Sequence, residues 1–241
     1  TLVFPGVFDT LSAKVAEHVG FPLAFISGYA VSATHIGEPD LGLLTQTEIV
    51  DRAKHICRSV RIPIIVDADT GYGNSLNVIR TVNELIDVGA AGCFLEDQEW
   101  PKKCGHMQGK SVIKHDDYIQ KIRAAVHARN GRDFFIVART DALAPAGLDE
   151  AIKRANAAHR AGADARSSGF GGGCLTVVRH SASALRATRR TSVIEVTPSI
   201  ARFHPSRRSV LIPCSSASFL ISLAGLCATT SARRSLSSIM I

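Results

Sequence analysis

The sequence predicts an α/β protein in which parallel strands alternate with helices, either as a βα-barrel or as a doubly wound sheet. Short apolar runs recur along the first 165 residues, and a polar residue follows each run. Nearly continuous apolar runs are typical of strands buried on both faces of a parallel sheet. Amphipathic stretches separate the runs at intervals of roughly 30–40 residues, as in folds built from strand–helix units.

Four apolar runs are the predicted strands. In folds of this class, functional groups gather at the carboxyl ends of the strands, so the polar residue after each run is a candidate functional group. The runs and the residues that follow them are Leu23–Ile26 before Ser27, Pro63–Val66 before Asp67, Cys93–Leu95 before Glu96, and Phe134–Ala138 before Arg139.

Helices are predicted between these strands from apolar residues at helical spacing. The first begins at Thr45–Glu48, which has the spacing of a capping box. Glycines after the later stretches are typical helix ends. The predicted apolar faces are Ile49, Ala53, Ile56 and Val60; Leu76, Ile79, Asn83 and Ile86 before Gly89; Ile119, Ile122 and Val126 before Gly131; and Leu148, Ile152, Ala155 and His159 before Gly162.

The alternation ends after Asp164. The segment Arg166–Gly169 stands where a fifth strand would begin, but it is too polar for a strand buried on both faces. The sequence therefore predicts two parts: residues 1–165, which carry the strand–helix pattern, and residues 166–241, which do not.

The second part has a different composition. Residues 1–165 carry a net charge of −2, whereas residues 166–241 carry +9, with 10 Arg, 16 Ser and a single acid, Glu195. Residues 166–241 also contain no Lys, Asp, Asn, Gln, Tyr or Trp. Three interpretations remain open: an out-of-frame or mis-spliced translation, a disordered Arg/Ser-rich tail, or a basic arm that binds nucleic acid. The last is not favoured, because the segment lacks a pattern of basic residues interleaved with aromatic residues.

Composition also bears on the compartment. No run of eighteen apolar residues is present, so a membrane span is not expected. No signal peptide is visible, although the missing initiator Met leads us to expect a missing leading segment. Six cysteines without a Cys-x-x-Cys pair favour a reducing compartment, either the cytoplasm or an organellar matrix of a mitochondrion or plastid.

A candidate metal site follows the second predicted strand. Asp67 and Asp69 stand two residues apart in the sequence Asp-Ala-Asp-Thr-Gly-Tyr-Gly. Mg²⁺ binds to one or two carboxylates and keeps several waters, so two carboxylates at a strand end suit it. The alternative is an ordinary turn in which Asp caps backbone amides. Glu96 and Asp97, after the next strand, add further anionic groups or are simply a solvated loop.

A reactive cysteine is the second candidate. Cys104 stands beside Lys102, Lys103 and His106, and these cations are expected to stabilise its thiolate. The alternative is an exposed basic loop with an incidental cysteine. Arg139 suits bidentate binding of a carboxylate, or a structural ion pair.

These residues occur within an ordered set of motifs that resembles the isocitrate lyase/phosphoenolpyruvate mutase superfamily. The resemblance covers residues 4–165 and is to its short members: methylisocitrate lyase, dimethylmalate lyase, petal death protein and the carboxyphosphonoenolpyruvate phosphonomutase-like enzymes. The motifs are Ser27–Tyr29, Gly37–Asp40, Asp67–Gly73, Leu95–Gln98, Lys103–His106 and Ala138–Ala142.

The resemblance implies an eight-stranded (β/α)8 TIM-type barrel, of which the first four to five units are legible here. It implies roles for eleven residues and a Mg²⁺ (or Mn²⁺) cofactor. Cys104 would be the acid/base on a mobile loop spanning roughly residues 102–113. The implied sets are catalytic Cys104, His106 and Lys103; substrate-binding Ser27, Gly28, Tyr29 and Arg139; and metal-binding Asp67, Asp69, Asp40 and Glu96.

The activity implied is Mg²⁺-dependent cleavage of a carbon–carbon bond in a small 2-hydroxy-dicarboxylate or tricarboxylate, such as methylisocitrate or dimethylmalate. The alternatives are oxaloacetate hydrolysis or decarboxylation, phosphonomutase chemistry, or a non-catalytic remnant with a basic binding tail. The resemblance implies a homotetramer. We expect the chain as written to be a poor or inactive enzyme, because four or five strands leave a barrel open.

Overall fold

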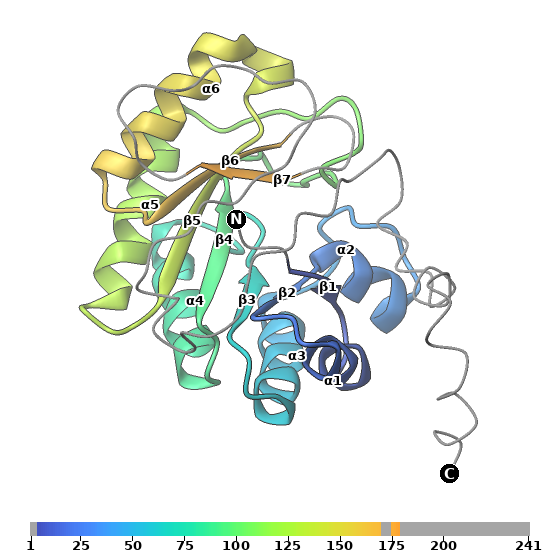
Figure 1. Ribbon diagram of the computed structural model, residues 1–241. Coiled ribbons are helices and arrows are strands. Elements are labelled where there is room, and N and C mark those ends of the chain that lie inside the picture. The colour runs from blue at the N-terminus through green and yellow to red at the C-terminus, as the bar shows by residue number, and fades with distance from the viewer. Residues whose placement is uncertain (1–3, 170–174, 179–241) are drawn as a thin grey trace.

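The computed structural model describes residues 4–169 and 175–178, and it shows one sheet with helices on its outer side (Figure 1). The strands follow the chain order β1 to β7 across the sheet. The first six pair in parallel, and the last pairs antiparallel with its neighbour. The strands are β1 Gly6–Val7, β2 Ala24–Ile26, β3 Ile64–Asp67, β4 Gly92–Glu96, β5 Phe135–Thr140, β6 Ala165–Gly169 and β7 Leu175–Val178.

Helices connect the parallel strands, and each long helix packs on the next: α1 on α3, α3 on α4, α4 on α5, and α5 on α6. This arc of helices around a sheet in chain order is the arrangement of a partial βα-barrel. The elements are α1 Thr10–Val19, α2 Gly28–Val31, a π-helix η1 Ser32–Ile36, α3 Gln46–Ser59, α4 Ser75–Asp87, α5 His115–Arg129 and α6 Leu143–Arg160.

The predicted strands are confirmed because their side chains are buried on both faces of the sheet. Ile26, Val66 and Leu95 belong to the large cluster between the sheet and its helices. A second cluster includes Leu23, Ile65, Phe94, Val137 and Ala165. Apolar residues at consecutive strand positions thus enter different layers, which explains the continuous runs in the sequence.

The helix boundaries follow from caps that the sequence contains. The predicted capping box is present at α3, where the Thr45 side chain accepts from the Glu48 amide and the Glu48 side chain accepts from the Thr45 amide. Gly89, with φ of 91°, ends α4 as predicted. Asn130, at φ of 45°, forms the left-handed cap of α5 one residue before the predicted Gly131.

Two predicted helix faces are displaced from the buried faces, although Ile79 and Ile86 of the α4 face pack against the edge of the core. Leu76 of α4 and Leu148 of α6 are 73% and 48% exposed, respectively. In α4 the buried side chains include Val78 and Leu85, which have the same spacing but a different phase. In α6 the buried face contains Arg154, and hydropathy periodicity does not place a charged residue in a core.

The prediction for Arg166–Gly169 is also wrong. These residues lie in β6, which pairs in parallel with β5 from Val137 to Thr140, and Ser167 is buried. Backbone pairing with a strand already in place decides the outcome here, over the polarity of the side chains. Residues 170–174 and 179–241 lie outside the described residues, so the three interpretations of the basic segment stay predictions.

Candidate active site

Polar side chains meet at the carboxyl edge of the parallel sheet, as predicted. Asp67 and Glu96 are the last residues of β3 and β4, Ser27 follows β2 directly, and Arg139 is the penultimate residue of β5. Asp40 reaches the same edge from the loop between η1 and α3, and it is buried. The four predicted metal-binding residues and Arg139 are thus gathered at one edge, where parallel strands place functional groups.

Lys102, expected from the sequence only to stabilise the Cys104 thiolate, instead forms ion pairs within this carboxylate cluster. Its ammonium forms ion pairs with the carboxylates of Asp40 and Asp69, the latter at 2.6 Å, and its side chain is 3% exposed. Burial lowers the pKa of Lys102, but the surrounding carboxylates outweigh burial and hold this pKa well above its ordinary value. The lysine therefore stays charged and neutralises part of the cluster.

The carboxylates themselves pay an energetic penalty for their burial. Burial raises the pKa of Asp67, and the neighbouring Asp69 raises it further. Burial also raises the pKa of Glu96, to about 8, against the opposing effect of Arg139 and Lys102. Additional positive charge nearby would stabilise the ionised form of these buried carboxylates.

Arg139 is held by two carboxylates in a fixed orientation. One guanidinium nitrogen lies 3.1 Å from Glu96 Oε2, and Nε lies 2.9 Å from Asp141 Oδ2. Asp141, which was not among the predicted site residues, is fully buried, and Arg139 and Lys110 lower its pKa against the effect of burial. These contacts are the ion pair that was the alternative for Arg139, and its binding of a substrate carboxylate stays a prediction.

The turn after β3 has a strained backbone. Asp69 and Tyr72 have φ of 47° and 59°, in the left-handed region that side chains other than glycine rarely adopt. The Glu96 amide donates to the Asp69 carbonyl at 2.8 Å, and the buried Lys121 ammonium donates to the Thr70 carbonyl at 2.9 Å. Neighbouring elements therefore impose this conformation, which turns the Asp69 carboxylate toward Lys102.

The end of β2 supplies close backbone contact and an aromatic ring. A Cβ on Gly28 would lie 3.1 Å from Asp67 Oδ2, so a glycine lets this backbone approach the carboxylate closely. The buried Ser27 hydroxyl caps α2 by accepting from the Ala30 amide. Tyr29 is partly exposed, and its ring stands edge-on to that of His106 at 5.8 Å.

The loop with the cysteine folds over this cluster. The Cys104 amide donates to the Asp40 carbonyl at 3.0 Å, which places Cys104 beside the acidic cluster. Gln98 fixes the base of the loop, because its side chain donates to the Lys103 carbonyl and accepts from the Lys103 amide. The Lys103 ammonium turns away and donates to the Gly109 carbonyl of the same loop at 2.8 Å, so the structure does not bring it to the carboxylates.

The expectation that Cys104 has a stabilised thiolate is wrong. Burial, helped by the charge of Asp40, raises the pKa of this thiol to about 11, and Lys102 lowers it by a smaller effect. The prediction relied on residues adjacent in sequence, but the Lys103 ammonium binds the Gly109 carbonyl instead. The thiol is protonated at neutral pH, which suits a proton donor and not a resting nucleophile.

The acidic cluster is a chemical match for Mg²⁺. Its donors are carboxylate oxygens, and Mg²⁺ takes one or two of these directly and keeps waters. Among the residues that the structure describes, no three His, Cys, Asp or Glu side chains are grouped to chelate one ion directly. Asp67 could hold such an ion directly, with Asp40, Asp69 and Glu96 acting through water, and this ligand set stays a prediction.

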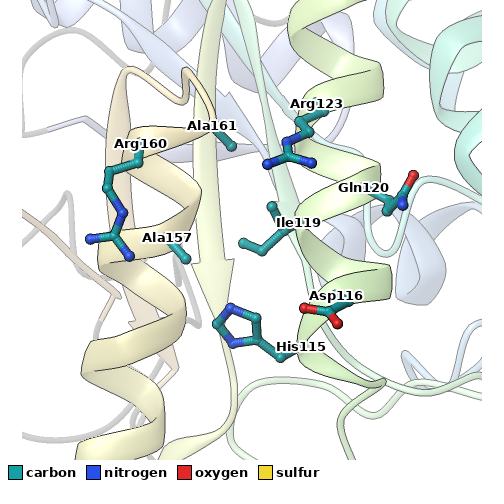
Figure 2. A pocket seen from close by; sticks show the side chains of 8 residues that line it. All are labelled: His115, Asp116, Ile119, Gln120, Arg123, Ala157, Arg160 and Ala161. Atoms are coloured by element: carbon teal, nitrogen blue, oxygen red, sulfur yellow. The ribbon is translucent and has the colours of Figure 1, made fainter.

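A hollow of about 370 Å³ lies elsewhere, between α5 and α6 (Figure 2). Arg123 and Arg160 border one end and His115 and Asp116 the other, as Figure 2 shows. None of the residues that line it belongs to the cluster at the strand ends. It is therefore a groove between two helices, apart from the residues gathered at the strand ends.

Comparison with known proteins decides the family. The family model described as phosphoenolpyruvate phosphomutase matches residues 1–168. The chain belongs to this family. It is 54% identical over 168 residues to the chloroplastic carboxyvinyl-carboxyphosphonate phosphorylmutase of Arabidopsis thaliana, covering 68% of this chain and 50% of that protein. It is 49% identical over 163 residues to 2,3-dimethylmalate lyase of Eubacterium barkeri, covering 68% and 56%.

Solved structures of family members share the fold. The match to a crystal structure of 2,3-dimethylmalate lyase has a TM-score of 0.68 at 41% identity and covers 70% of this chain and 57% of that one. The match to oxaloacetate acetylhydrolase with an inhibitor has a TM-score of 0.67 at 42% identity and covers 68% and 57%. The chain spans about half the length of the curated relatives it matches, and the match to the family model ends within β6.

The raised pKa of Cys104 predicts slow alkylation near neutral pH. Because the thiolate is the nucleophile, we expect iodoacetamide to modify Cys104 at pH 7.5 roughly a hundredfold more slowly than a free cysteine. The rate should reach half its maximum near pH 11. Peptide mass spectrometry resolves Cys104 from the other cysteines, and the urea-unfolded chain is the control. A half-maximal rate below pH 9 would contradict this assignment.

Proposed function

We propose that residues 1–169 form the metal- and substrate-binding half of a Mg²⁺-dependent carbon–carbon lyase that acts on small 2-hydroxy-dicarboxylates or tricarboxylates. The observation that carries this proposal is the protonated Cys104 thiol, held by a backbone hydrogen bond beside the cluster of buried carboxylates. A proton donor next to cations that bind carboxylates is what cleavage adjacent to a carboxylate requires.

In the proposed cleavage, a carboxylate of the cluster is the base and the Cys104 thiol is the acid. A carboxylate of the cluster takes the proton of the substrate hydroxyl, and a C=O bond forms at that carbon. The carbon–carbon bond breaks, and its electron pair moves to the carbon next to the departing carboxylate. The Cys104 thiol delivers a proton to this carbon and becomes a thiolate. The carboxyl group then releases the proton that it took from the hydroxyl, and the thiolate takes up one proton from solvent, which restores both groups for the next turnover.

The residues at the strand ends would orient the substrate for this step. Arg139, positioned by Glu96 and Asp141, would bind a substrate carboxylate. The Lys102 ammonium, charged and buried, would stabilise negative charge that develops on oxygen. A Mg²⁺ ion held by Asp67 would supply Lewis-acid polarisation of the substrate oxygens.

A second candidate is hydrolysis or decarboxylation of oxaloacetate on the same site. The 42% identity to a protein named oxaloacetate acetylhydrolase supports it. The motif Lys103–His106, which resembles that of the C–C lyases, favours the lyase.

For location, no helix in the described part of the chain is long and apolar enough to cross a membrane. We propose the cytoplasm or an organellar matrix, and one relative is named chloroplastic.

The metal site is tested by replacing Asp67 in the 241-residue chain. We expect Asp67→Ala to weaken Mn²⁺ binding at least tenfold, measured by electron paramagnetic resonance of the free ion, because this carboxylate is the proposed direct ligand. The control is Asp87→Ala, which removes a carboxylate that is 73% exposed on α4. Equal Mn²⁺ affinity in the Asp67 variant and the parent chain would remove Asp67 from the site.

The proton donor is tested in a chimera that joins residues 1–168 to the remaining half of Eubacterium barkeri 2,3-dimethylmalate lyase. We expect turnover of 2,3-dimethylmalate, and a loss of at least about a hundredfold in kcat with an unchanged KM in Cys104→Ser, since an alcohol is a far weaker acid than a thiol. Cys57→Ser, which changes a half-buried cysteine on α3, is the control. Full turnover in the Cys104 variant would exclude the thiol as the donor.

A further inference from the structure

Another lysine whose side chain is buried, Lys110, connects the cysteine loop to the end of β5. Its ammonium donates to Asp141 Oδ1 at 2.8 Å and to the Gly105 carbonyl. The side chain of Lys110 is 5% exposed and that of Asp141 is fully buried. Lys110 follows Cys104 in the same loop by six residues, yet it has no part in the chemistry proposed above.

Lys110 contacts both the opposite arm of its own loop, at Gly105, and the residue that follows β5, Asp141. The two arms of the loop already meet at its base, where the Glu99 amide donates to the Ser111 carbonyl and Gln98 bridges to Val112. Lys110 adds a bond from the returning arm to Gly105, directly after Cys104. The pair with Asp141 then fixes both arms to the sheet.

Asp141 is shared between this lysine and Arg139. Arg139 Nη2 donates to the same Oδ1 atom at 3.1 Å, while its Nε lies 2.9 Å from Oδ2. The loop also lies close to the arginine, since a Cβ on Gly105 would stand 3.1 Å from Arg139 Nη2. The residue that would bind substrate and the loop that bears the thiol therefore depend on one carboxylate.

We infer that Lys110 is a positioning residue whose bond to Asp141 holds the Cys104 loop closed over Arg139. Charged groups buried together in this way are costly to separate, because the ammonium and the carboxylate would each lose a partner. Lys110 thereby joins the proposed site. Only its effect on catalysis rests on the proposed role of Cys104. The closure itself is independent of the reaction.

Alkylation of Cys104 by iodoacetamide at a fixed pH of 8 tests this in the 241-residue chain. We expect Lys110→Met to raise the rate at least fivefold, because the loop opens and exposes the thiol. Lys110→Arg should keep the rate within twofold of the parent, since it retains the charge and donors. Lys114→Met, at an exposed lysine just after the loop, should change nothing. An unchanged rate in Lys110→Met, or a raised rate in Lys114→Met as well, would overturn the inference.

A second measurement on the unmodified chain does not depend on any variant folding. Acetylation by an N-hydroxysuccinimide ester should label Lys110 at least tenfold more slowly than Lys114, because a buried, paired ammonium is shielded from the reagent. Equal labelling of the two lysines would show that the bond to Asp141 does not persist in solution. Both measurements read closure without turnover, so a failure of the lyase proposal would leave them interpretable.

Discussion

The buried ionic cluster at the carboxyl edge of the sheet is the interaction on which the rest of this structure depends. Asp40 and Asp69 share the Lys102 ammonium, and Glu96 shares the Arg139 guanidinium with Asp141. Carboxylates placed this deeply are tolerated only when they are paired and hydrogen-bonded. Three parallel strands, the loop after η1 and the cysteine loop must all be in place for these pairs to form, so the cluster links the fold to its chemistry.

Much of this architecture follows from local sequence. Apolar runs such as Pro63–Val66 identify strands because both faces of a parallel sheet are covered, and the Thr45–Glu48 box fixes a helix start. Because parallel strands present their carboxyl ends at one edge, Asp67, Glu96 and Arg139 were predicted to lie near one another, and they do.

The remaining features depend on three-dimensional neighbours. Lys102 and Lys103 are adjacent and chemically alike, yet one enters the carboxylate cluster and the other bonds within its loop. The pKa of Cys104 is raised chiefly by burial and by Asp40, which are neighbours in space that the sequence around the cysteine does not reveal. The polar segment Arg166–Gly169 forms a strand because β5 offers a pairing edge, which the side chains of that segment do not reveal.

Replacement of Lys102 by methionine tests the central role of the cluster most directly. The measurement is urea unfolding of the parent chain and of Lys102→Met, each with and without Mg²⁺. If the lysine neutralises buried carboxylates, the variant without metal should lose about 3 kcal/mol or more of unfolding free energy, as expected when one partner of a buried ion pair is removed. Mg²⁺ should then stabilise the variant more than the parent, because an uncompensated anionic cluster binds the cation more favourably. A loss below about 1 kcal/mol, within the range of exposed ion pairs, together with an equal response to Mg²⁺, would contradict the account.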